Sequence, residues 1–219
     1  MTHTYDSEIA SWLVELLANG PNPYVRPLQR PSGQAAPSSL PSCESEIARR
    51  TRDLAVPGPY GVPDVTVPVS APAERDGPLL GLLYIHGGGE NALPAGLEDC
   101  YPAVAGTATS ASELGIDSGC IGVAGETEGT GLAVAVALLA RDRGGPALCF
   151  QYPGATDLDD RLQTLSTRSY GDALLRNHQV RQGSWDCYLG AGQRGTAHVS
   201  PFVSPLRAEN PSIRRGPGA

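Results

Sequence analysis

The sequence predicts an α/β fold, a mostly parallel sheet with flanking helices, from three observations. Two short apolar runs, Gly81–His86 and Cys120–Ala124, have the length of strands buried on both faces. Each run ends at glycine, and the second is followed by an apolar segment of helical length, Gly131–Arg141. A further strand is expected to open at Ala147–Gln151. Strand, turn, helix and strand in this order are typical of a parallel sheet.

The other elements are weaker in the sequence. Apolar side chains recur at helical spacing in residues 8–18, and a Pro-, Ser- and Gln-rich stretch at 21–42 is expected to be irregular. A short polar helix is expected at 44–53. Residues 63–70 alternate in the manner of a strand, and their two prolines favour a sheet edge. Residues 97–114 have a weak helical pattern.

Charge and composition exclude several classes of function. The net charge is −7, and all 16 basic residues are arginine, so the clustered positive charge that binds nucleic acid is missing. The longest apolar run, Leu132–Ala140, has nine residues and is too short to span a bilayer. The glycine-rich segment at 125–131 lacks the lysine of a phosphate-binding loop. No nucleic-acid partner, membrane span or cofactor is therefore expected.

Five cysteines are dispersed along the chain without a Cys-x-x-Cys pair, which argues against a disulfide framework and against a zinc site. They are Cys43, Cys100, Cys120, Cys149 and Cys187. The polar, acidic first residues do not resemble a secretory signal. We therefore expect reduced thiols in a cytoplasmic protein, with no bound metal.

Two segments carry candidate chemistry. His86-Gly87-Gly88-Gly89 ends a predicted strand, and glycines there allow backbone N–H groups to face a developing negative charge. Gly125-Glu126-Thr127-Glu128-Gly129 lies between a predicted strand and a predicted helix. This is the placement of a nucleophile elbow, in which flanking small residues permit a strained turn that presents one hydroxyl. Either segment alone is a weak signal, but together, and with the residues between them, they become specific.

The chain resembles the hormone-sensitive-lipase-like esterases of the α/β-hydrolase fold. Leu82–Gly89 matches the oxyanion loop of that family, and Gly122–Gly125 leads into its elbow. Further segments follow in the family's order: 56–65, 93–101, 113–117, 138–145, 158–161 and 203–208. The resemblance implies an incomplete α/β-hydrolase fold, with a cap-like and irregular segment at 1–55 and a partial core at 56–219.

The same resemblance implies a carboxylic-ester hydrolase acting on small acyl esters. Thr127 would be the nucleophile, the backbone of Gly87, Gly88, Gly89 and Glu128 would form the oxyanion hole, and His86 would support the glycine loop. The oligomeric state is not indicated by the sequence.

The elbow departs from the family's Gly-Asp-Ser-Ala-Gly. Thr127 keeps a hydroxyl, but its β-branch is poorly tolerated at the backbone angles of an elbow and costs on the order of 1–3 kcal/mol. Glu128 brings a carboxylate near the oxyanion. At about 5 Å and an effective dielectric of ~20, the repulsion is roughly 3 kcal/mol, unless the side chain turns into solvent.

Two further departures concern whole segments. Only Glu90-Asn91-Ala92 separate the glycine triplet from Leu93, where the family has a helix and an interior strand. Loss of that strand is expected to split the sheet or to make its neighbours pair anew. The family's triad Asp and His lie beyond the segment that 204–208 resembles, and no matching pair is present. Activity is therefore expected to be weak or absent, and the alternative is a catalytically silent relative or fragment that acts at most as a binding module.

Other polar residues leave alternatives open. His178 and His198 follow Thr127 and an acidic group, so either is formally placed to replace the missing base, although surface histidines are the simpler interpretation. The acidic group Asp157, Asp159 and Asp160 is expected to be a solvated loop rather than a cation site.

Overall fold

The computed structural model describes residues 47–58, 63–87, 95–155, 157–169 and 177–212, together with 171 and 173. The predictions for 8–18 and 21–42, and the positions of Gly88 and Gly89, lie outside these residues. The chain divides into two compact units. The described part of one unit is 159–199, and that of the other is 47–158 with 200–212. The second unit carries the sheet and the elbow.

An antiparallel ribbon opens the described chain. β1 (Arg49–Val56) pairs with β2 (Val65–Pro72) along their full lengths, with Val56 opposite Val65. The predicted helix at 44–53 is therefore wrong, because β1 begins within it and hydrogen bonding to β2 outweighs the local preference of a polar segment. The alternation expected at 63–70 is confirmed, since every second side chain of β2 is exposed.

The main sheet is parallel, as predicted. It has three strands in the order β3-β4-β5: β3 (Leu79–Ile85), β4 (Ile116–Glu126) and β5 (Phe150–Gly154). Tyr84 pairs with Ala124, which pairs with Tyr152, so the carboxyl ends of all three strands meet at one edge. In the part of the chain that the structure describes, the ribbon β1-β2 is a separate sheet. This agrees with the split expected from the missing interior strand.

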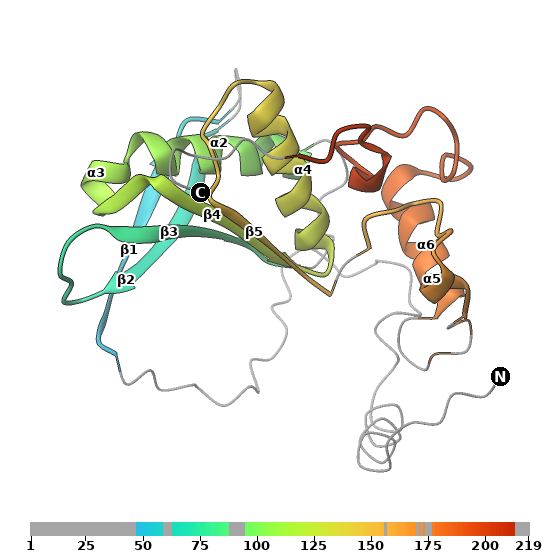
Figure 1. Cartoon of the computed structure of the whole chain (residues 1–219), viewed down its shortest axis with the longest axis horizontal. Coiled ribbons are helices and arrows are strands. Elements are labelled where there is room, and N and C mark those ends of the chain that lie inside the picture. Colours follow the sequence, from blue (N-terminus) through green and yellow to red (C-terminus); the bar gives the residue numbers. More distant parts are fainter. Residues whose placement is uncertain are drawn as a thin grey trace, which may run out of the picture. The chain divides into compact units, whose positions relative to one another are not determined.

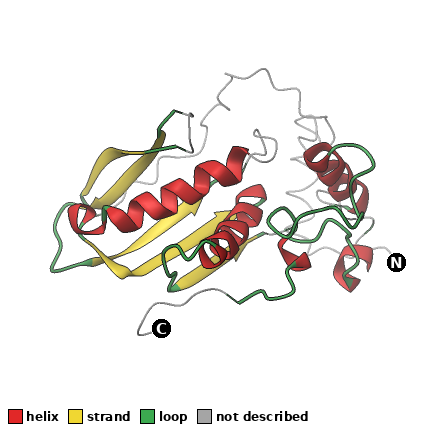
Figure 2. Ribbon diagram, turned by 90° about the horizontal axis from the view of Figure 1, so that it is seen from above, coloured by secondary structure: helices red, strands yellow, loops and turns green. Residues whose placement is uncertain are grey.

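Two long helices cover one face of this sheet. α2 (Ala95–Thr109) is followed by the short α3 (Ala111–Leu114), and α4 (Glu128–Asp142) follows β4. Figure 2 shows α2 and α4 on the same side of the strands. The core between them is made of small and branched residues, including Val104, Ile121, Val123, Val136 and Leu148. The α/β architecture predicted from the sequence is confirmed.

The opposite face of the sheet remains exposed. Leu80, Leu82 and Tyr84 on β3 and Tyr152 on β5 are each about half exposed or more. The prediction that 81–86 is buried on both faces is therefore wrong, because only the face toward α2 and α4 is covered. Together these side chains expose more contiguous apolar surface than the single apolar side chains that are normal on a protein surface.

The remaining described elements are short. α5 (Leu165–Ser169) and α6 (His178–Leu189) belong to the unit of 159–199, and α6 is capped by the Asn177 side chain, which accepts from Val180 N at 2.9 Å. The 3-10 turn η1 (Pro205–Arg207) belongs to the sheet-bearing unit. The division into 1–55 and 56–219 stays a prediction, although β1 continues across that boundary. None of the described helices combines the length and apolarity needed to cross a bilayer.

Candidate functional site

The predicted elbow is a strand–turn–helix junction. β4 ends at Glu126, α4 begins at Glu128, and Thr127 between them has φ 50° and ψ −119°. Figure 1 shows the end of β4 leading directly into the first turn of α4. A β-branched residue at positive φ is strained, at a cost on the order of 1–3 kcal/mol. The backbone therefore adopts the sharp turn that the sequence predicted, with threonine in its strained position.

The flanking glycines are required by close backbone contacts. A Cβ on Gly125 would lie 2.2 Å from the carbonyl oxygen of Gly129. A Cβ on Gly129 would lie 2.2 Å from the carbonyl oxygen of Ile85 and 2.6 Å from that of His86. These separations are far below van der Waals contact, so the first turn of α4 packs directly on the end of β3. The elbow and the glycine loop are thereby held together.

The candidate nucleophile lies against the first glycine of the triplet. A Cβ on Gly87 would be 1.9 Å from Thr127 Oγ1, so the hydroxyl occupies the space that the missing side chain leaves. Among the described residues, the Thr127 hydroxyl forms no hydrogen bond with a side chain that could act as a base. The hydroxyl thus lies beside Gly87, with no hydrogen-bonded side-chain base in the described part of the chain.

The His86 side chain contacts the carbonyl group of the next residue. Its Nδ1 lies 2.6 Å from the carbonyl oxygen of Gly87, and since a carbonyl can only accept, Nδ1 carries the proton. The lone pair of the ring is then on Nε2, and the supporting role of His86 stays a prediction. Glu128 is exposed at the start of α4.

A buried threonine that sequence reasoning missed ties the elbow to β5. Thr130 is fully buried, and its Oγ1 lies 2.8 Å from the carbonyl oxygen of Gly125 and within hydrogen-bond distance of that of Gly154. Its single proton is shared between two carbonyl groups on neighbouring strands. No pattern in the sequence distinguishes this residue from an ordinary helical threonine.

A second polar contact lies on the exposed face of the sheet. The pKa of the Tyr84 phenol is raised by loss of solvation, then by a hydrogen bond to the Glu126 carboxylate and by its negative charge. Glu126 also packs its Cγ against Gly154, where a Cβ would lie 3.3 Å away. The residue before Thr127 therefore points toward Tyr84 and β5.

Neither of the two candidate substitute bases lies in the unit of Thr127. His178 is the first residue of α6, and His198 lies in a loop; both belong to the unit of 159–199. That either histidine replaces the missing base stays a prediction.

The acidic group is not a solvated loop throughout. Asp159 pairs with Arg161 at 2.7 Å, and Asp160 is fully buried, accepting a hydrogen bond from Gly195 N at 2.7 Å. The prediction is wrong for Asp160, because its carboxylate holds the glycine-rich turn around residue 195. Among the described residues, no group of three or more His, Cys, Asp or Glu side chains is placed to hold a metal ion.

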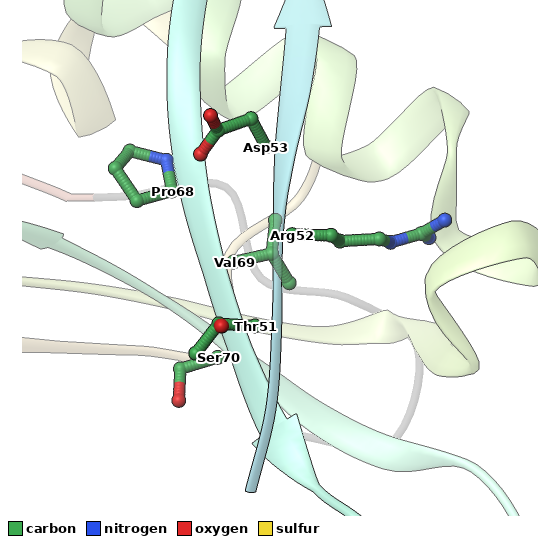
Figure 3. A pocket seen from close by; sticks show the side chains of 6 residues that line it. All are labelled: Thr51, Arg52, Asp53, Pro68, Val69 and Ser70. Atoms are coloured by element: carbon green, nitrogen blue, oxygen red, sulfur yellow. The ribbon is translucent and has the colours of Figure 1, made fainter.

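A shallow hollow lies elsewhere, on the β1-β2 ribbon (Figure 3). Its lining side chains are Thr51, Arg52 and Asp53 from β1 and Pro68, Val69 and Ser70 from β2. No elbow residue contributes to it. All of its lining residues belong to the ribbon. The Arg52 guanidinium forms an ion pair with the Glu113 carboxylate of α3, with 2.8 Å between Nη1 and Oε1.

The chain is similar to proteins of the alpha/beta hydrolase fold and to esterases. A profile described as alpha/beta hydrolase fold matches residues 88–217. Esterase LipI of Mycobacterium tuberculosis (strain ATCC 25618 / H37Rv) is 30% identical over 199 residues, which cover 74% of this chain and 60% of LipI. Carboxylesterase NlhH of the same organism is 44% identical over 62 residues, which cover 28% of this chain and 19% of NlhH. The chain thus spans less than two thirds of the length of these relatives.

Solved structures show the same fold. A bacterial heroin esterase is 27% identical with a TM-score of 0.68, over 92% of this chain and 67% of that protein. A hyperthermophilic esterase from Pyrobaculum calidifontis is 26% identical with a TM-score of 0.60, over 73% of this chain and 61% of that protein. A thermostable esterase from Pseudomonas putida has a higher TM-score, 0.73, at 22% identity, and supports the fold alone.

Proposed function

Because the chain belongs to the alpha/beta hydrolase fold family, we propose that it is a slow carboxylic-ester hydrolase acting on small acyl esters. The observation that carries the proposal is the Thr127 hydroxyl, held at a strained strand–helix turn against Gly87. The likeness to Esterase LipI and to a bacterial heroin esterase supports the same class of reaction. A cytoplasmic location belongs to this proposal as well.

In the proposed reaction, Thr127 Oγ1 attacks the ester carbonyl and its proton passes to solvent. The N–H groups of Gly87, Gly88 and Glu128 stabilise the oxyanion, and Gly89 completes the loop. The alcohol leaves, and water then releases the acid from the acyl-threonine. Glu128 is exposed, which reduces the repulsion between its carboxylate and the oxyanion.

The rate is expected to be low. A hydroxyl that lacks a general base is a poor nucleophile at neutral pH. In enzymes whose triad is dismantled, oxyanion stabilisation and binding alone retain roughly 10³–10⁴-fold acceleration over water. The strain at Thr127 and the carboxylate of Glu128 beside the oxyanion place this chain at or below that range.

Initial rates with p-nitrophenyl acetate test the assignment. Thr127→Ala is expected to reduce the protein-dependent rate to that of buffer. Thr109→Ala is the matched control, since it removes an exposed helical hydroxyl that bonds only to Ala105 O. An unchanged rate in Thr127→Ala would show that Thr127 is not the nucleophile.

The second candidate is a catalytically silent relative that retains acyl binding. This candidate is favoured because, among the described residues, no side chain that could act as a base is hydrogen-bonded to the Thr127 hydroxyl. A silent relative predicts no burst with activated esters and no labelling of Thr127 by an organophosphate. An acyl ester would then bind without turnover, which isothermal calorimetry detects.

A further inference from the structure

Two strained turns lie next to each other at the carboxyl edge of the parallel sheet. Thr127 follows β4 with φ 50°, and Ala155 follows β5 with φ 46°. The two strands are hydrogen-bonded neighbours (Figure 1), and Glu126 at the end of β4 is opposite Gly154 at the end of β5. A non-glycine residue keeps such a positive φ only where the surrounding contacts hold its backbone in place.

Thr130, in the first turn of α4, is bonded to both turns. Its backbone N–H donates to the carbonyl oxygen of Thr127 at 3.2 Å. Its Oγ1 lies 2.8 Å from the carbonyl oxygen of Gly125 and also within hydrogen-bond distance of that of Gly154. The Gly154 carbonyl belongs to the peptide bond that leads into Ala155. Thr130 therefore contacts the backbone before and after Thr127, and the backbone directly before Ala155.

The Thr130 hydroxyl is fixed in this position. The residue is 0% exposed, and a β-branched side chain on a helix has few rotamers. Its backbone also fits tightly, since a Cβ on Gly125 would lie 2.8 Å from Thr130 N. Gly125 is buried too, so loss of the hydroxyl would leave its carbonyl oxygen facing an apolar group, which is costly. The hydroxyl therefore helps to hold the two turns together.

Another buried threonine shows what an ordinary helical hydroxyl does in this protein. Thr107 of α2 donates from Oγ1 to the carbonyl oxygen of Ala103 at 2.7 Å, four residues earlier in the same helix. This bond back to the preceding turn is usual for a helical threonine. The Thr130 hydroxyl contacts β4 and β5 instead. Thr107 therefore serves as a matched control for the loss of a buried hydroxyl away from the elbow.

We propose that Thr130 is a positioning residue for the Thr127 hydroxyl. Its bonds to the carbonyl groups before and after Thr127 fix the strained turn, and with it the direction in which the Thr127 side chain points toward Gly87. Its contact with Gly154 couples the elbow to the turn after β5. The effect on catalysis rests on the proposed ester hydrolysis, whereas the effect on the turn is a property of the fold.

Steady-state kinetics with p-nitrophenyl acetate test the effect on catalysis. Thr130→Val keeps the shape of the side chain and removes the hydroxyl, whereas Thr130→Ser keeps the hydroxyl. Because a misplaced nucleophile lowers the rate of the chemical step, Thr130→Val is expected to lower kcat by about 10–100-fold with little change in KM. Thr130→Ser should restore most of kcat, and Thr107→Val should resemble the wild-type chain. A change in KM alone, or an equal loss of kcat in Thr107→Val, would overturn the proposal.

A second measurement does not need activity. The shift in urea midpoint caused by Thr127→Gly is measured in the wild-type chain, in Thr130→Val and in Thr107→Val. If Thr130 holds the strained turn, the shift should fall to about half or less in Thr130→Val and stay unchanged in Thr107→Val. Equal shifts in all three backgrounds would overturn the proposal.

Two further provisions keep the test decisive. Thr130→Ala, compared with Thr130→Ser, replaces the valine variant if that chain does not fold. If the wild-type chain does not hydrolyse the ester, the proposed function fails, while the urea midpoints still decide whether Thr130 holds the turn.

Discussion

The hydroxyl of Thr127 fills the space above the α-carbon of Gly87. Its Oγ1 lies 1.9 Å from the point that a Cβ on Gly87 would occupy, and the Glu126 carbonyl oxygen lies 3.1 Å from the same point. A residue after β3 and a residue after β4 are thus fitted to each other across the edge of the sheet. This contact joins the two segments that the sequence singled out for acyl chemistry.

A methyl group on Gly87 should therefore displace the Thr127 hydroxyl. Gly87→Ala is expected to lower the free energy of unfolding by about 1–3 kcal/mol through overpacking. The loss should be smaller when Thr127→Gly is also present, because the clashing side chain is gone. Denaturant unfolding of both single variants and the double variant measures this coupling. Additive losses would show that the two residues do not touch.

The strain at Thr127 predicts a stability gain when it is relieved. Thr127→Gly is expected to stabilise the protein by about 1 kcal/mol, since relief of a 1–3 kcal/mol strain exceeds the entropic cost of glycine. Thr127→Ala keeps a Cβ at positive φ and should gain less. Urea midpoints of the two variants compare them directly. Equal stabilities would contradict a strained turn.

Glycine is required at 129 for a different reason. A Cβ there would meet the carbonyl oxygens of Ile85 and His86, which cannot move without shifting β3. Gly129→Ala is therefore expected to destabilise by about 3 kcal/mol or more. Gly131→Ala, two residues along α4 in open space, should stabilise by roughly 0.5–1 kcal/mol. Thermal melts that show similar effects for both would refute the close packing of α4 on β3.

Because of Cys100, the free energy of unfolding should depend on pH in the alkaline range. Burial, and then the charge of Asp99, raise the pKa of its thiol from 9.0 to about 11. The unfolded thiol ionises first, so this contribution is intact below about pH 9 and is lost as the pH rises toward 11. The loss is expected to reach about 2–3 kcal/mol. The free energy of unfolding should change less with pH across this range in Cys100→Ala than in the wild-type chain. An equal pH dependence in both would show that Cys100 is not the cause.

The order of elements and the elbow followed from the sequence because they depend on local patterns. Apolar runs, glycines and turn spacing specify strand, turn and helix without knowledge of the neighbours. The strand at Arg49–Val56 was missed, since its polar residues adopt β structure only by pairing with β2. The exposed face of β3 was missed for the same kind of reason: an apolar run does not reveal which of its faces will be covered.

Several polar roles were equally invisible in the sequence. Asp160 is buried because Gly195, 35 residues away, presents its N–H to the carboxylate. Thr130 matters because two carbonyl groups from different strands converge on it. Each depends on contacts between segments that no single-sequence pattern encodes.

The measurement that tests the central claim most directly is detection of an acyl-threonine. The wild-type chain and Thr127→Ala are incubated with p-nitrophenyl acetate, quenched in acid, and digested for peptide mass analysis. Slow ester hydrolysis through the elbow predicts an added acetyl group on Thr127 of the wild-type chain and on no equivalent peptide of the variant. Turnover without that adduct, or acetylation that persists in Thr127→Ala, would contradict it.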